Sequence, residues 1–199
     1  MSTSRNIDSW QQVNSRAGFA AYLRFLAFDC EGAGEGKDPG APSARRWTHQ
    51  SIDGFLWGWV RLLRSRIDGT DLLQEEAPGR PGWRGLAYQL DRVRTTPPMF
   101  NCAFADSGTR PEEVDTVWGL RLYAAALATD FARDQREMRA RADRGERIGD
   151  GGSWAHSALR DWLGAWAAWV GADSPRHAQL DPVTWRSVAE QLSVARIYE

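Results

Sequence analysis

One stretch of the sequence occurs twice and organises the rest of the chain. It reads Trp-Thr-His-Gln-Ser-Ile-Asp-Gly-Phe-Leu-Trp-Gly-Trp at residues 47–59 and Trp-Ala-His-Ser-Ala-Leu-Arg-Asp-Trp-Leu-Gly-Ala-Trp at residues 154–166. With a shift of 107 residues, the first and last tryptophans, the histidine and one leucine recur identically. Two tryptophans and one histidine in the same register indicate an internal duplication.

The segments on either side of this stretch repeat as well. At a shift of 101 residues, the segment that begins at Val13 matches the one that begins at Val114. At a shift of 102 residues, the segment from Trp83 matches the one from Trp185. The differences in length fall only in the Gly- and Pro-rich segments between these blocks, where a repeat tolerates insertions. The sequence therefore predicts three structural elements in each of two similar units.

We expect the first unit to span residues 1–98 and the second unit to span residues 113–199, with a linker at residues 99–112. The two units should form one compact fold. The expected arrangement is packing about a pseudo-twofold axis, with like faces in contact, as in isologous dimers.

Each repeated block has the hydrophobic periodicity of an α-helix. Apolar residues recur at spacings of three and four in residues 13–29, 52–63 and 83–93,. The first helix of the second unit is expected to continue to Arg144, because the residues on the way there favour a helix. No useful length of sequence alternates with period two. The predicted fold class is therefore all-α, with six principal helices in two similar halves.

The composition is typical of a soluble globular protein and disfavours several kinds of partner. Apolar residues make up 42% of the 199 residues and charged residues 26%, which suits a chain that buries a core,. A net charge of −1 gives no basic field for nucleic acid or for an acidic membrane surface,. We find no secretory signal and no apolar run of about 18 residues, so we expect a cytoplasmic protein without a membrane span.

Familiar catalytic signatures are missing from the sequence. It has no phosphate-binding loop motif, no Gly-x-Ser-x-Gly, no His-Glu-x-x-His and no Cys-x-x-Cys,. The three histidines are far apart in the sequence, and the two cysteines, Cys30 and Cys102, do not correspond in the repeat. We therefore expect neither a metal ion nor a cofactor.

Two motifs resemble a small bacterial domain family of unknown function. The first is Trp-x-[Asn/His]-x-x-[Leu/Ile]-x-x-Phe-Leu-x-[Ala/Gly] at residues 47–58. The second is Trp-x-x-x-Ala-x-x-Leu-x-x-Ala-x-x-Tyr-Glu at residues 185–199. The family usually has Trp-Glu-Asn where this chain has Trp-Thr-His and Trp-Ala-His. The resemblance implies a helical fold and a cytoplasmic bacterial setting, and it implies no activity.

Duplicated histidines are the first candidates for a functional site. His49 and His156 could meet across the pseudo-twofold axis and act as an acid and a base, or bind a ligand,. Alternatively, each could sit at a helix start and bond to backbone groups, in place of the family's asparagine.

Duplicated carboxylates form a second pair of candidates. Asp29 and Asp130 could lie together as a buried pair with shifted pKa values,. The alternative is an ordinary carboxylate at each helix end. The helix dipole disfavours a negative charge there, so this reading predicts a partner such as Arg84 or Arg186.

Aromatic residues are the last group of candidates for a functional site. Tyr22 and Tyr123 lie on the apolar stripe of the first helix in each unit, where they either pack in the core or line a cavity,. The chain has 11 tryptophans. Six of them recur in pairs and are expected to form the repeat core. The others, Trp57 above all, could line a cavity or anchor a protein partner.

Two classes of function follow from these features. The first is a non-catalytic helical binding protein for a small hydrophobic molecule or a protein partner. The alternative is a cofactor-independent enzyme of the cyclase or isomerase type. A ligand is expected between the halves, where these side chains would reach it: His49, His156, Tyr22, Tyr123, Trp57, Asp29 and Asp130.

Overall fold

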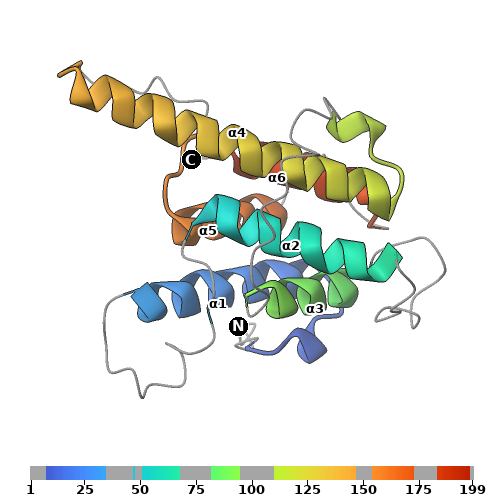
Figure 1. Ribbon diagram of the computed structural model, residues 1–199. Helices are drawn as coiled ribbons and strands as arrows, with labels where there is room; N and C mark the ends of the chain where they lie inside the picture. The colour runs from blue at the N-terminus through green and yellow to red at the C-terminus, as the bar shows by residue number, and fades with distance from the viewer. Residues whose placement is uncertain are drawn as a thin grey trace.

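The described part of the computed structural model is mainly helical. The structure describes residues 8–34, 47, 51–67, 82–94, 110–146, 154–172 and 183–197. Within these ranges the chain forms six α-helices and two short 3-10 helices, and no strand (Figure 1). The prediction of an all-α fold is confirmed.

The first half begins with a short 3-10 helix, η1, and contains three α-helices. Their bounds are Trp10–Gln12 for η1, Arg16–Gly34 for α1, Ile52–Ile67 for α2 and Trp83–Val93 for α3. The start of α1 is capped by Ser15, whose hydroxyl oxygen accepts a hydrogen bond from the backbone N–H of Gly18 at 3.2 Å,. The α2 helix is buried on all sides over residues 54–60, so it lies in the interior rather than at the surface,.

The second half has the same order of elements. Their bounds are Pro111–Glu113 for η3, Val117–Asp143 for α4, Leu159–Gly171 for α5 and Trp185–Ala195 for α6. Under the shifts found in the sequence, α5 begins at the counterpart of the first residue of α2, and α6 begins at the counterpart of the first residue of α3. Thr116 caps α4 as Ser15 caps α1.

The α4 helix is the longest of the described helices. The predicted continuation of this helix is confirmed, because it ends at Asp143 with Arg144 as its C-cap. Its C-terminal end extends beyond the other helices (Figure 1). Arginines alternate with acidic residues and alanines along this end, which is largely exposed.

The helices of the two halves pack crosswise. The α1 helix packs mainly on α5, and α2 packs mainly on α4, so each of these four helices lies chiefly against the other half. The α3 helix lies against α1 and α2, and α6 lies against α4 and α5. One continuous hydrophobic core therefore runs through both halves.

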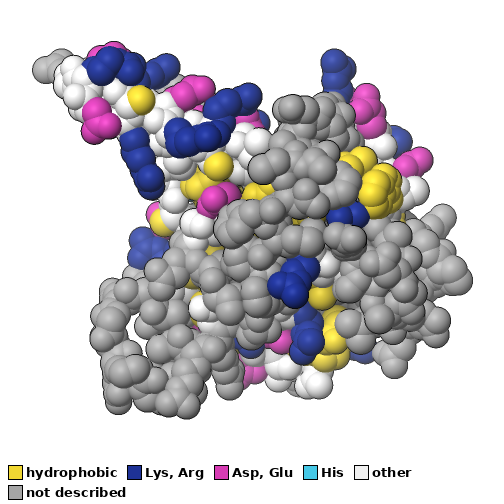
Figure 2. Space-filling view, viewed as in Figure 1, with side chains coloured by type: hydrophobic (Ala, Val, Ile, Leu, Met, Phe, Trp, Pro, Cys, Tyr) yellow, Lys and Arg dark blue, Asp and Glu magenta, His cyan; other side chains and the backbone are white. Residues whose placement is uncertain are grey.

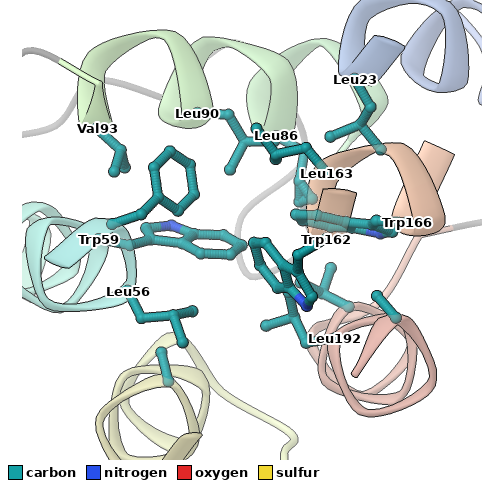
Figure 3. Packing of buried hydrophobic residues seen from close by; sticks show 14 of the residues in the cluster. Leu23, Leu56, Trp59, Leu86, Leu90, Val93, Trp162, Leu163, Trp166 and Leu192 are labelled. Carbon is teal, nitrogen blue, oxygen red and sulfur yellow. The ribbon is translucent and has the colours of Figure 1, made fainter. Parts of the chain in front are cut away.

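Aromatic rings fill the centre of this core. Trp59 and Trp166 have ring centroids 6.1 Å apart, and Phe55 and Trp162 have ring centroids 6.2 Å apart. In each pair the two residues correspond under the shift of 107, which is how residues near a twofold axis meet. Figure 3 shows the three tryptophans between leucines of α3 on one side and leucines of α2 and α6 on the other.

No helix in the described ranges combines the length and the apolar character needed to cross a membrane.

Candidate functional site

The first polar cluster is built around Asp29, near the C-terminal end of α1. Its carboxylate accepts hydrogen bonds from Trp47 Nε1 at 2.8 Å and from Arg94 Nη1 at 2.9 Å. Trp47 precedes α2, and Arg94 is the C-cap of α3. One carboxylate therefore holds together the ends of three segments. The guanidinium group supplies the positive charge that the helix dipole cannot offer at this end.

The cluster continues from Arg94 to Tyr22. Arg94 Nη2 lies 2.7 Å from Asp91 Oδ1, and the hydroxyl of Tyr22 donates to the same oxygen at 2.9 Å. Burial raises the pKa of Tyr22 well above its ordinary value, and the charge of Asp91 raises that pKa further. Tyr22 is therefore a neutral hydrogen-bond donor over the range in which proteins are active, rather than a general base.

The second cluster is built around Asp130 on α4. Its carboxylate accepts from Trp154 Nε1 at 3.0 Å and lies 3.2 Å from Arg196 Nη1, and it also pairs with Arg133. The guanidinium carbon of Arg196 lies 5.4 Å from the centroid of the Trp154 ring, which adds a cation–π contact,. The arrangement of aspartate, tryptophan and arginine matches that around Asp29.

The two clusters differ in charge. Ser193 occupies the position that corresponds to Asp91, and it is hydrogen-bonded to Tyr123. Burial raises the pKa of Tyr123, as it does in the first half. The first cluster contains two carboxylates and one arginine, whereas the second contains one carboxylate and two arginines. The second cluster is therefore the more positive one.

The expected arginine partners were wrong. The carboxylates pair with the arginines at the C-terminal ends of α3 and α6, and not with Arg84 or Arg186. Arg84 lies in the first turn of α3, and its Nε donates to the backbone carbonyl of Val13 at 3.2 Å. A helix of 11 residues places its two ends about 15 Å apart, so only the C-terminal arginine reaches the carboxylate,.

The remaining candidates are placed as follows. Trp57 is buried within α2 and does not face solvent. His156 is half-buried just before α5, beside Ala155, whose backbone N–H donates to the carbonyl of Arg196 at 2.9 Å. His49 lies outside the described residues. The structure thus brings predicted residues together within each half, with Tyr22 near Asp29 and Tyr123 near Asp130.

Two buried glutamines were not identified from the sequence. Trp59 Nε1 donates to Gln89 Oε1 at 2.9 Å, and Trp166 Nε1 donates to Gln191 Oε1 at 3.1 Å. The glutamines are 1% and 0% exposed. Because an indole N–H can only donate, the amide oxygen must face it. The recurrence of Gln-Leu at the shift of 102 was the available signal for this pairing.

Among the buried side-chain atoms that lack a hydrogen-bond partner in the described part of the chain are Nε2 of each glutamine and Nε1 of Trp162. Trp162 lies beside Trp166, with ring centroids 5.5 Å apart, and its counterpart in the first half is Phe55, which has no donor. Each buried donor left without a partner costs about 1–3 kcal/mol of stability.

Comparison of the chain with protein-family models, with curated proteins and with solved structures finds no match. In the described part of the chain, no group of three or more His, Cys, Asp or Glu side chains is placed to hold a metal ion. Any function is therefore inferred from this chain's own residues.

Proposed function

We propose that this chain is a duplicated helical unit that acts as a cytoplasmic, non-catalytic binding protein for a protein partner. The observation that carries the proposal is an exposed tryptophan beside an arginine at the start of α4. Trp118 is 43% exposed, and the guanidinium carbon of Arg121 lies 4.9 Å from the centroid of its ring.

The surface around this pair has the character of an interaction site. Hydrophobic side chains reach the surface next to arginines over the N-terminal end of α4 (Figure 2). Tryptophan is among the residues most enriched in positions that dominate binding energy at protein interfaces. Arg121 is itself only 3% exposed, so the group that this pair offers to a partner is the Trp118 ring. The position corresponding to Trp118 in the first half is Ala17, so this surface belongs to the second half alone.

The duplication itself is supported by matching interactions. Trp47 and Trp154 donate to corresponding aspartates, and Trp59 and Trp166 donate to corresponding glutamines. The polar residues common to both halves therefore have a shared structural use. A function specific to this chain is better sought where the halves differ, as they do at Trp118.

The alternative of a cofactor-independent enzyme is less well supported by the geometry. Asp29 and Asp130 are engaged by tryptophan and arginine side chains, and Tyr22 by Asp91. The ring-filled centre between the halves also favours a recognition surface on the outside over a ligand held inside.

The test is affinity capture with the intact protein and two matched variants. Trp118→Ala removes the exposed ring at α4, whereas Phe28→Ala removes an equally apolar ring on α1 that is 76% exposed. We expect a partner that is captured by the wild type and by Phe28→Ala, and that is lost with Trp118→Ala. With the purified partner, Trp118→Ala should weaken binding about 30-fold or more, because hot-spot truncations cost about 2 kcal/mol or more.

The competing small-molecule function is tested with 1-anilinonaphthalene-8-sulfonate as a hydrophobic probe. Stoichiometric binding of the probe to the folded protein, with quenching of buried tryptophan fluorescence, would favour an internal ligand site. A partner that binds Trp118→Ala as tightly as the wild type would contradict the proposed surface.

A further inference from the structure

We propose that neither half of this chain folds by itself, because each half provides the surface on which the first two helices of the other half are built. The partner that each half requires is the other half. This goes beyond duplication, since duplicated units often fold independently and then touch.

The close packing of α1 on α5 is the first observation that supports this dependence. A Cβ atom added at Gly171 on α5 would lie 3.3 Å from the Cβ of Ala20 and 3.1 Å from Arg24 Nη2, both on α1. The two helices thus approach so closely that a larger residue at Gly171 would press on α1. Phe19 of α1 contacts Trp166 of α5, with ring centroids 5.6 Å apart.

The α2 helix depends on the second half in the same way. It packs mainly on α4, while its own half contributes the shorter α3. Phe55 and Trp59 are fully buried, and both rings meet tryptophans of α5. Removing the second half would expose these rings, each of which buries about 150–250 Å² in a folded protein.

The contacts within the first half are mainly polar contacts at the ends of its segments and the packing of α3. Asp29, Trp47 and Arg94 join the ends of its segments through hydrogen bonds. The α3 helix lies against both α1 and α2, but α1 and α2 lie chiefly against α5 and α4. In an isolated first half the hydrogen bonds of the polar cluster would be left to hold the segments together, while α1 and α2 would expose most of the apolar surface that they bury on α5 and α4.

The experiment is native-state hydrogen exchange on the full chain, read out peptide by peptide. The variant is Phe19→Ala, which removes a fully buried ring on α1. The reporter is α6, which packs on α4, α5 and η3 in the second half. If the halves fold as one unit, the slowest-exchanging amides of α6 and α3 should accelerate by the same factor, about 100-fold or more.

The control is Phe28→Ala on the same helix, where the ring is exposed, and it should leave exchange unchanged in both halves. If Phe19→Ala does not fold, Phe19→Leu is the milder change, with an expected common acceleration of about 10-fold. Faster exchange in α1 and α3 with unchanged exchange in α6 would overturn the proposal, because it would show that the second half is stable without the first.

Discussion

The hydrogen bond between Trp166 and Gln191 lends itself to a test in which a second substitution should restore stability. Trp166→Phe keeps an aromatic ring in the core and removes the indole N–H that donates to Gln191 Oε1. The amide Nε2 of Gln191 already lacks a partner among the described residues. In the variant, both ends of a side chain that is 0% exposed would be unsatisfied.

The magnitude follows from two effects. An unsatisfied buried polar group costs about 1–3 kcal/mol. The smaller ring also loses apolar burial, at about 0.8 kcal/mol for each methylene-sized group. We therefore expect Trp166→Phe to lower the free energy of unfolding by about 3 kcal/mol. Adding Gln191→Leu removes the stranded amide and should return about 1–2 kcal/mol, since replacing both partners with apolar groups is nearly neutral.

The assay is urea unfolding of the wild type, both single variants and the double variant, followed by the helical circular dichroism signal. The single variant Gln191→Leu should lose about 1 kcal/mol, because it strands the indole N–H while removing the unpaired amide. The same cycle at Trp59 and Gln89 serves as an internal replicate, since the hydrogen bond there has nearly the same length.

A double variant that is less stable than Trp166→Phe would refute the reasoning. It would mean that Gln191 stabilises the core through contacts other than the indole hydrogen bond. If the stability recovered by the second substitution differs between the two cycles, we would attribute the difference to Trp162, which adjoins Trp166 and corresponds to Phe55 in the first half.

Three further outcomes are expected. Trp59→Ala should cost about 3–5 kcal/mol in urea unfolding, because the ring is fully buried, and a loss below about 1 kcal/mol would contradict that burial,. Burial raises the pKa of Tyr22, so this side chain should stay un-ionised in an absorbance titration at 295 nm until the protein unfolds. Its contribution to stability is full below about pH 10 and is lost as the pH rises above that value,. Burial raises the pKa of Cys30 to about 11, so in a Cys102→Ser background a thiol reagent at pH 8 should react only after unfolding, and rapid reaction with folded protein would be the contrary result,.

The candidate site was only partly accessible from the sequence. One of the two interpretations of the duplicated aspartates predicts an arginine partner for each, as observed, but it names Arg84 and Arg186 instead of Arg94 and Arg196. A choice between Arg84 and Arg94 depends on which end of α3 reaches Asp29, and helical periodicity does not contain that information. Among the unpaired tryptophans, the sequence favours Trp57 as a site residue, yet Trp57 is buried and Trp118 is exposed.

Most of the helix positions followed from the sequence alone, although α1 continues to Gly34, beyond the predicted end at Asp29. Apolar spacing, helix-breaking residues and the repeated blocks are local features, and local features determine where a helix begins and ends. The matching starts of α2 with α5 and of α3 with α6 were already visible as shifts of 107 and 102 residues.

Only the tertiary structure determines which helix packs against which other helix. An apolar stripe shows that one face of a helix is buried, but the hydrophobic effect has no direction and does not specify the covering partner. The sequence is equally compatible with α1 lying on α2 of its own half and with the observed packing on α5. The difference arises from how the rings of Phe19, Trp59 and Trp166 fit together in three dimensions, and shape complementarity of that kind exists only in the folded core,.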